Sequence, residues 1–435
     1  MDFRGRKLIL FCGDILLLYG SLLFVLMMRY WGVVSWELIS QHIGLFSVLY
    51  VFWLVLFYIF DAYDLSTDLT LKRINQYFVA LCMAFFVGVL FFYLISFSEI
   101  SPKTILFFHV VLFGVVSLFW RRFFFAKVSR LDPLIIGVIG SDKEALELQQ
   151  LIRSRSHLGQ VCVPLRSVEH LKFHIEEQKL NVIVLPSALF LDPMVIAQVY
   201  VCLGKGVVFL DFARAYELFA KRIPLSTIEH LWFLQNIEER DRSFYQRSKR
   251  WFDIVISVLL ILVTLPLWVL LVVVIKLSDG DSVFYTQERM GKNGQLFSII
   301  KFRTMHTDAE RNGPLWATKE DTRITFVGGI LRRTHLDELP QLLNVLKGDL
   351  SLVGPRPERP NFVELLEAEI PHYHVRHFIK PGITGWAQIK FRYARSVVDS
   401  QMKFEYDLYY LKNRTFLFDF LILLKTTHFF LKGES

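Results

Sequence analysis

The hydrophobic residues of the chain gather in long runs at its N-terminal end. Four such runs predict transmembrane helices at 8–28, 43–60, 77–95 and 105–120, because each approaches the roughly 20 apolar residues that cross a bilayer as a helix. The first run lacks the cleavage pattern of a signal peptide and is followed by further apolar runs, so we interpret it as a retained anchor. Residues 1–128 are therefore predicted to form a four-helix transmembrane bundle.

Basic residues are distributed unevenly among the loops of this bundle. Loops 29–42 and 96–104 hold only Arg29 and Lys103. The other positive charges lie before the first helix, between the second and third, and after the fourth: Arg4, Arg6, Lys7, Lys72, Arg73, Arg121, Arg122 and Lys127. By the positive-inside bias, both ends of the bundle face the cytoplasm.

Residues 129–242 change to short apolar runs that alternate with helical segments. LIIGVIG, NVIVLP and GVVFLD are typical of buried strands, and the alternation predicts a parallel sheet of the Rossmann-like kind. The Gly137–Gly140 turn lacks the G-x-G-x-x-G spacing that brings a backbone close to a pyrophosphate. We therefore expect a degenerate nucleotide site and a structural, regulatory or oligomerising role, with nucleotide binding as the alternative.

A fifth apolar run, residues 251–276, contains Pro266 near its centre and is flanked by Lys and Arg on both sides. A proline inside a helix removes a hydrogen bond and bends the axis. A re-entrant helix that breaks at Thr264-Leu265-Pro266 and returns to the same membrane face satisfies both facts, with the Thr264 hydroxyl available to bond a freed carbonyl. An ordinary kinked span is the alternative.

The rest of residues 243–435 is polar enough for a soluble domain on the membrane surface. Two strands within SVFYTQERM and LFSIIKFRTM, a helix over 335–347 and a final amphipathic segment, NRTFLFDFLILLKTTHFFLK, are predicted. The expected fold is a multi-domain membrane protein: a helical transmembrane bundle, a central Rossmann-like α/β domain, and a C-terminal α/β domain on a re-entrant helix.

Composition narrows the class of ligand. The chain is 53% hydrophobic and 21% charged, with a formal net charge of +8. No helix-turn-helix, zinc-knuckle or RNP-like pattern accompanies the basic excess, so we expect no nucleic acid and favour anionic lipids and phosphate ligands. The four cysteines are far apart and form no CxxC pair, as expected of small core residues in a reduced compartment: Cys12, Cys82, Cys162 and Cys202.

The stretch THLDELPQLLNVLKGDLSLVGPRP carries the candidate chemistry. Thr334 with Asp337 before an apolar run fits a helix capping box, which is the structural interpretation. Pro340 fits only near a helix start, so Asp337 and Glu338 lie at a terminus and point in different directions. An aspartate can attack an activated phosphoryl group, and a divalent ion held by the second carboxylate would screen the repulsion between two anions.

Several cations surround this pair in the sequence. Prolines on both sides of Arg356 restrict its backbone, so its guanidinium loses less freedom on binding. Any one of these residues alone is typical of a lipid headgroup contact, but their concentration favours phosphate binding. The candidate phosphate ligands are Lys301, Arg303, Arg332, Arg333 and Arg356.

Two other motifs are interpreted as decoys. Tyr245 and Lys249 match the Y-x-x-x-K spacing of short-chain dehydrogenases, but they border an apolar run and follow no glycine fingerprint, so a juxtamembrane basic cluster is favoured. The spacing of His372, His374 and His377 does not place all three on one helical face, so zinc binding is not expected.

The blocks KFRTM (301–305), LDELPQLLNVLKGDLSLVGPRP (336–357) and KPGITGWAQI (380–389) resemble the bacterial sugar transferase family. These are monotopic polyprenyl-phosphate hexose-1-phosphate transferases, and the preceding domains resemble the long-form members. The resemblance covers about 247–435. Many members have Ser-Pro at the helix break, whereas this chain has Leu265-Pro266 after Thr264.

The resemblance implies an enzyme of the bacterial inner membrane whose catalytic domain faces the cytoplasm. It implies that Asp337 is the nucleophile, that Glu338 helps to bind magnesium (Mg2+), and that Arg332 and Arg356 contact substrate phosphate. Such an enzyme transfers a sugar-1-phosphate from a UDP-sugar to undecaprenyl phosphate, the first membrane step of exopolysaccharide, capsule or O-antigen synthesis. A catalytically silent membrane scaffold and a nucleotide-sugar oxidoreductase are the alternative functions. The sequence does not identify the hexose, the glycan or the oligomeric state, for which a homodimer is one option.

Overall fold

A computed structural model of the chain divides it into two compact units, Met1–Ala215 and Tyr216–Ser435, each with its own hydrophobic core. The structure describes residues 3–31, 35–63, 65, 71–94, 103–127, 133–156, 159–169, 171–228, 230–237, 243–279, 282–306, 323–391 and 396–432. The predicted domain boundaries near 128 and 242 lie outside these residues.

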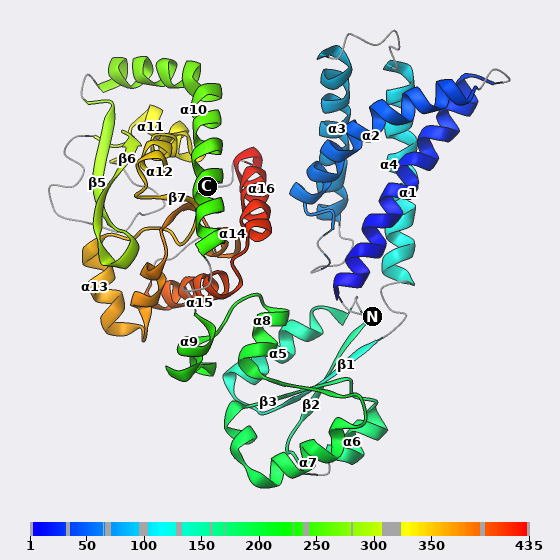
Figure 1. Cartoon of the computed structure of the whole chain (residues 1–435), viewed down its shortest axis with the longest axis vertical. Coiled ribbons are helices and arrows are strands. Elements are labelled where there is room, and N and C mark those ends of the chain that lie inside the picture. The colour runs from blue at the N-terminus through cyan, green and yellow to red at the C-terminus, as the bar shows by residue number, and fades with distance from the viewer. Residues whose placement is uncertain are drawn as a thin grey trace. The chain divides into compact units, whose positions relative to one another are not determined.

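The first unit begins with the four predicted helices, all of which are confirmed and slightly longer than expected. They are α1 (Phe3–Arg29), α2 (Trp36–Ile59), α3 (Leu71–Leu94) and α4 (Lys103–Ala126). Within the bundle α1 packs on α4 and α3 packs on both α2 and α4 (Figure 1). Among the described residues, these four helices and one in the second unit are long and apolar enough to cross a membrane.

The bundle interior contains polar groups that the sequence analysis did not identify. Asp14 and Arg121 form a buried bidentate ion pair, with Nη1–Oδ1 at 2.9 Å and Nη2–Oδ2 at 2.6 Å. The His109 ring is hydrogen bonded to the hydroxyls of Tyr50 (2.9 Å) and Ser21 (3.1 Å). Ionisable groups inside a membrane bundle are costly unless paired, so these contacts tie the helices into one register.

A four-stranded parallel sheet follows, with strand order β2-β1-β3-β4. The strands are β1 (Leu134–Ile139), β2 (Gln160–Leu165), β3 (Val182–Leu185) and β4 (Val208–Asp211). The parallel sheet was predicted, but β2 was missed. Figure 1 shows α5 (Lys143–Arg153) and α8 (Phe212–Phe219) on one face of it, and α6 (Leu171–Gln178) and α7 (Pro193–Leu203) on the other.

The second unit is organised around α10 (Ser243–Asp279), which contains Pro266. Figure 1 shows α10 as two limbs joined by a sharp bend. The first limb packs against α12 (Gln341–Lys347) and β7 (Ser351–Val353). On the second limb, Trp268 packs with Phe302 and Leu331 in a separate apolar cluster. Packing on both limbs therefore fixes the bend in the folded domain.

The remaining elements of this unit place the candidate site. A hairpin of β5 (Phe284–Met290) and β6 (Leu296–Phe302) confirms the two predicted strands. β7 pairs in parallel with β8 (Gly382–Thr384). The other helices are α9 (His230–Asn236), α11 (Phe326–Arg333), α13 (Pro360–Glu369), α14 (Trp386–Lys390), α15 (Val397–Asn413) and the predicted C-terminal α16 (Phe416–Lys432), with short 3-10 turns η6 (Lys292–Gly294), η7 (Leu336–Glu338) and η8 (Tyr373–Phe378).

The single helix predicted over 335–347 is wrong in detail. The chain forms the 3-10 turn η7, and α12 begins only at Gln341, after Pro340. The capping box with Thr334 is also wrong, because the Thr334 hydroxyl donates backward to the Ile330 carbonyl (2.8 Å) and ends α11. The carboxylate pair therefore lies in a turn between two helices rather than in the first turn of one.

Candidate active site

Asp337 and Glu338 lie in the turn η7 between α11 and α12. His335 begins this turn in the left-handed conformation, with φ of 53°. Such a conformation is uncommon for a residue with a side chain, and it reverses the chain directly after α11. Asp337 is consequently buried, with 7% of its surface exposed. The turn presents two adjacent carboxylates in different environments.

Glu338 is held by two cations from separate elements. Lys301 Nζ, from β6, donates to Glu338 Oε1 at 2.7 Å, and Arg356 Nη2, from the loop after β7, donates to the same oxygen at 2.7 Å. Charge-assisted contacts of this length in a partly dry site are strong. The three side chains form a clamp that fixes the geometry beside Asp337.

The two carboxylates differ in proton affinity. Burial is the main cause that raises the pKa of Asp337 to about 6, and the charge of Glu338 adds to it, while Lys301, Arg332 and Arg356 partly offset the rise. Burial would also raise the pKa of Glu338, but Arg356 and Lys301 outweigh it and hold that pKa well below its usual value. Near neutral pH, Asp337 is thus a charged but weakly stabilised carboxylate, as a nucleophile requires.

The loop that carries Arg356 is fixed through its backbone. Arg376 Nη2 donates to the Arg356 carbonyl at 3.0 Å, and Arg289 Nη1 donates to the Pro357 carbonyl at 3.0 Å. Arg376 is itself anchored by a buried ion pair with Asp407 at 3.0 Å. The guanidinium of Arg356 is therefore aimed by residues distant in the sequence.

Two glycines let this loop pass close to β8. The Gly382 N–H donates to the Pro355 carbonyl at 2.9 Å. A Cβ on Gly382 would lie 2.1 Å from the Gly354 nitrogen, a separation that no side chain can adopt. The GPRP and KPGITG segments of the sequence are therefore one structural unit.

Asn344 connects α12 to the strand that carries Lys301. Its amide oxygen accepts from the Ile300 N–H at 3.0 Å, and its amide nitrogen donates to the Ser298 carbonyl at 2.8 Å. Asn344 is fully buried, so these bonds form out of water. They set the distance between η7 and β6, and hence between Glu338 and Lys301.

The five predicted cations do not all converge. Lys301 and Arg356 contact Glu338, and Arg332 is near enough to lower the pKa of Asp337 while its Nε donates to Thr304 Oγ1 at 2.9 Å. Arg303 instead donates to Ser282 Oγ at 2.5 Å, and Arg333 is exposed at the end of α11. Phosphate binding by all five stays a prediction.

The residues present are compatible with one divalent ion. Among the described residues, no group of three or more His, Cys, Asp or Glu side chains is clustered as a metal site. Magnesium, however, commonly uses one or two carboxylates and completes its shell with water and substrate phosphate. Both cations hold Oε1 of Glu338, which leaves Oε2 and the Asp337 carboxylate to face such an ion.

The helix break is supported by side chains, but not as predicted. Thr264 Oγ1 donates to the Leu260 carbonyl at 2.6 Å and accepts from the Trp268 indole at 3.2 Å. Pro266 has no backbone N–H, so the carbonyl of Leu262 is the one that loses its helical hydrogen bond. Thr264 therefore bonds a neighbouring carbonyl, and it also links the two limbs through Trp268.

The two motifs interpreted as decoys make contacts that hold the domain together. Tyr245 and Lys249 both bond Asp419 of α16, at 2.7 and 2.8 Å. The rings of His372 and Phe233 are in contact, with centroids 4.4 Å apart. Neither set lies on the carboxylate pair.

Comparison with known proteins assigns this unit. The model of the bacterial sugar transferase family matches residues 244–433, and the chain is 39% identical to "Exopolysaccharide production protein ExoY" of Sinorhizobium fredii over 194 residues, which are 41% of this chain and 83% of that protein. The chain belongs to the bacterial sugar transferase family. The matched region begins at α10 and includes every residue of the clamp, whereas the four N-terminal helices and the parallel sheet lie outside it.

Other members of the sugar transferase family are longer than the matched region. The chain is 44% identical over 189 residues (43% of the chain) to "UDP-N-acetylgalactosamine-undecaprenyl-phosphate N-acetylgalactosaminephosphotransferase" of Aeromonas hydrophila, and spans 45% of it. It is 39% identical over 191 residues (43% of the chain) to "UDP-glucose:undecaprenyl-phosphate glucose-1-phosphate transferase" of Xanthomonas campestris pv. campestris, and spans 39% of it. The chain thus matches less than half the length of these two relatives.

Proposed function

We propose that this sugar transferase moves a sugar-1-phosphate from a UDP-sugar to undecaprenyl phosphate, as the first membrane step in the synthesis of an exopolysaccharide, capsule or O-antigen. The observation that carries the proposal is the buried Asp337 carboxylate beside the Lys301–Glu338–Arg356 clamp. The names of the relatives support the substrate classes, because they refer to UDP-sugars and undecaprenyl phosphate.

The proposed reaction has two displacements at one phosphorus. In the first, an Asp337 oxygen forms a bond to the sugar-bearing phosphorus of the UDP-sugar while the bond to UMP breaks, and UMP leaves with the electron pair. In the second, a phosphate oxygen of the lipid forms a bond to the same phosphorus, and the bond to Asp337 breaks. The carboxylate is regenerated, and the product is a lipid-diphosphate sugar.

The other side chains prepare this step. Arg356 and Lys301 neutralise Glu338, so that an anionic diphosphate can approach the turn without facing two uncompensated carboxylates. Arg332 supplies positive charge on the Asp337 side. Magnesium, when bound by Glu338 and Asp337, would add charge stabilisation to the phosphates.

Asp337→Asn tests the nucleophile. An amide cannot attack phosphorus, and Asn preserves the volume of the buried side chain, so we expect a folded protein with no UMP release and no covalent phosphosugar adduct. The measurement is UMP release, together with intact-protein mass after incubation with a UDP-sugar and magnesium. Lys347→Gln, a substitution of an exposed cation in the same domain, should behave as wild type. An adduct on the Asn variant would assign the chemistry to another residue.

Magnesium is tested by chelation. Excess EDTA should abolish UMP release, and added magnesium should restore it. Glu338→Gln should raise the magnesium concentration needed for half-maximal activity, because a metal ligand loses its charge. Undiminished release in EDTA would remove the metal from the proposal.

We further propose that α10 is a re-entrant membrane helix and that the catalytic domain faces the cytoplasm at a bacterial inner membrane. The bend at Pro266 and the packing of both limbs on one domain support this placement. The parallel sheet is proposed to be Rossmann-like with a degenerate nucleotide site, since its first turn lacks the glycine fingerprint. The intact carboxylate pair and clamp argue against a silent scaffold.

A further inference from the structure

A second polar pocket lies in the catalytic unit, away from the carboxylate pair. It has a volume of about 440 Å³ and is formed by the start of α10, β7, the η6 turn, the segment before β8 and the α15–α16 junction. Asp253 is its only carboxylate lining residue among those described. Its walls carry six cations: Arg247, Lys249, Arg250, Lys292, Lys380 and Arg414.

The pocket and the turn η7 lie at opposite ends of α12. Arg250 Nη1 and Nη2 donate to the carbonyls of Val345 and Leu346 in the last turn of α12, at 2.5 and 2.7 Å. Asp337 precedes the first turn of the same helix. A seven-residue helix is about 10 Å long, so one small ligand does not occupy both places.

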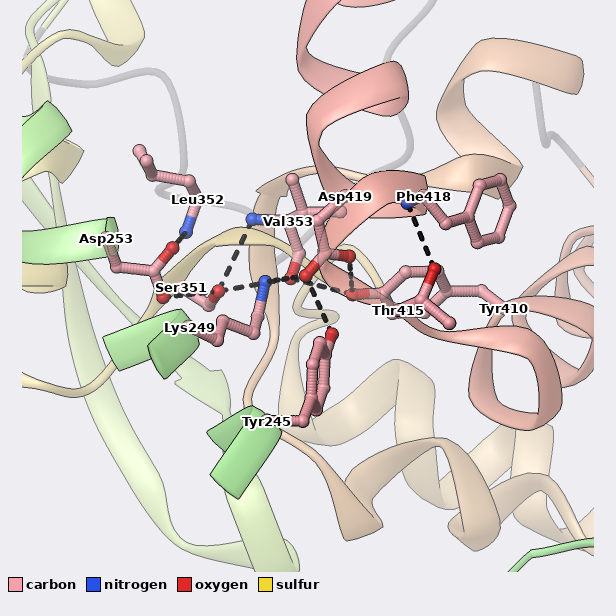
Figure 2. Close-up of polar contacts among 10 residues, drawn as sticks. All are labelled: Tyr245, Lys249, Asp253, Ser351, Leu352, Val353, Tyr410, Thr415, Phe418 and Asp419. Atoms are coloured by element: carbon pink, nitrogen blue, oxygen red, sulfur yellow. Dashed lines mark hydrogen bonds and ion pairs between the residues drawn. The ribbon is translucent and has the colours of Figure 1, made fainter. Parts of the chain in front are cut away.

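Residues along one wall of the pocket are hydrogen bonded to one another or to groups behind the wall (Figure 2). Asp419 accepts from Tyr245 and Lys249 on α10 and from Tyr410 on α15, all between 2.7 and 2.8 Å. Asp253 accepts from the Ser351 hydroxyl at 2.8 Å. Both carboxylates are thus hydrogen bonded within the protein. The side chains that line the pocket carry a net positive charge.

Lys380 is a basic residue of the pocket without a bonded partner in the described part of the chain. Among the described residues it makes no hydrogen bond or ion pair. The side chains of Lys380 and Arg250 both approach Gly348, which has φ of +104°. A Cβ on Gly348 would lie 3.7 Å from Lys380 Nζ and 3.5 Å from Arg250 Nη2. Burial and then the charge of Arg250 lower the pKa of Lys380, and Lys292 adds to this effect, while Asp253 and Asp349 offset only part of it. An anion in the pocket would relieve this repulsion.

The pocket lies where polar surface gives way to exposed apolar surface. Directly after Arg250, Trp251 is 71% exposed and Val255 is 49% exposed on α10. Directly after Arg414, Phe416 and Leu417 of α16 are 46% and 65% exposed. Phe252 and Phe416 are in ring contact, which places these two apolar surfaces side by side. A ligand with an anionic head and apolar tails matches both regions.

We propose that this pocket binds the phosphate headgroup of an anionic membrane phospholipid, with its acyl chains along α10 and α16, as a site separate from the Asp337 centre. A phosphatidylglycerol headgroup brings a net negative charge, whereas the choline cation of phosphatidylcholine would be repelled by six basic side chains. The site goes beyond the proposed reaction, because the lipid bound there is not consumed.

Photolabelling tests this site. Full-length protein is placed in phosphatidylcholine nanodiscs that contain a small fraction of phosphatidylglycerol with a photoreactive headgroup, and labelled peptides are mapped by mass spectrometry. We expect label on peptides that contain Gln246 or Lys380. Lys380→Gln should reduce it several-fold, whereas Lys380→Arg should keep it. Lys347→Gln matches the loss of charge outside the pocket and should leave labelling unchanged.

Three outcomes would overturn the proposal. The first is equal labelling of wild type and Lys380→Gln. The second is equal labelling by a phosphatidylcholine probe of the same design. The third is loss of label on addition of excess inorganic phosphate, which would make the pocket a site for a free anion. UMP release in phospholipid-free detergent should be unaffected by Lys380→Gln, so the result is independent of the proposed reaction.

Discussion

At the scale of single residues, two adjacent carboxylates have different protonation behaviour because their partners differ. Glu338 receives two cations on one oxygen and stays ionised, while burial makes the charge on Asp337 costly. Groups whose surroundings separate their pKa values commonly have separate roles. This difference supports the proposed roles, in which Glu338 organises the charges and Asp337 reacts.

The raised pKa of Asp337 predicts how activity depends on pH. In the proposed reaction the ionised form of Asp337 is the nucleophile, so kcat/KM for UMP release should fall as pH drops through about 6 and reach a plateau above it. Arg356 lowers the pKa of Asp337, so Arg356→Gln should move the inflection to higher pH as well as reduce the plateau. The measurement is a pH profile of UMP release.

Lys347→Gln is the control for this profile, because it also removes one positive charge but does so on an exposed side chain. Its inflection should coincide with that of wild type. A profile that stays flat well below pH 6, or an Arg356→Gln inflection that does not move, would contradict this role of Asp337.

The sequence identifies the candidate reacting residues more readily than the residues that position them. Asp337, Glu338 and Arg356 stand in one short stretch, and a resemblance to known motifs identifies them. The pair of Arg376 and Asp407 was missed, since 31 positions separate the two residues and neither lies in a recognisable motif. A long-range ion pair leaves no periodic pattern along the chain, so only the fold shows that it supports Arg356.

At the scale of elements, the bend of α10 depends on unequal packing along the helix. Val263 and Val269, on either side of Pro266, are 77% and 61% exposed. Trp268 is 9% exposed and packs on Phe302 of β6. The second limb is therefore attached to the domain by one face, and Trp268 is the largest side chain on that face.

Trp268→Ala should loosen the second limb. Removing a buried tryptophan from a core costs about 3–5 kcal/mol, and this substitution also removes the indole bond to Thr264. We expect a lower midpoint of thermal unfolding in detergent and faster proteolysis near the bend. Trp251→Ala is the matched control on the same helix, since Trp251 is 71% exposed; it should leave the midpoint nearly unchanged. Equal loss in both variants would contradict the packing argument.

Some helices and strands could be predicted from sequence patterns and others could not. The four N-terminal helices and the two strands that pair as the β5–β6 hairpin were predicted, because long apolar runs and alternating strands are strong signals. Strand β2 was missed, since QVCVPL contains a proline and only two of its residues are buried. The break between η7 and α12 depends on the left-handed His335, a conformation that the helical spacing of the apolar residues around it does not reveal.

At the scale of the whole molecule, membrane topology decides whether the proposed donor can reach Asp337. Basic residues predict a cytoplasmic position for both ends of the N-terminal bundle. If α10 crossed the bilayer, Asp337 would lie outside the cytoplasm. Instead both limbs contact the same folded domain, through α12 and β7 on one limb and β6 on the other. Because one domain packs on both limbs, a helix that enters and leaves the membrane on the same side is favoured over a helix that crosses it.

Cysteine labelling tests this topology. In a background without Cys12, Cys82, Cys162 and Cys202, single substitutions Gln246→Cys, before the apolar run, and Lys347→Cys, at the exposed end of α12, should be protected from a membrane-impermeant maleimide in spheroplasts. Both should react once the inner membrane is opened. Trp31→Cys, at an exposed position after α1 on the predicted periplasmic side, is the positive control and should react in intact spheroplasts. If Lys347→Cys instead reacts there as fast as Trp31→Cys, α10 is a span, and a cytoplasmic UDP-sugar cannot be the donor.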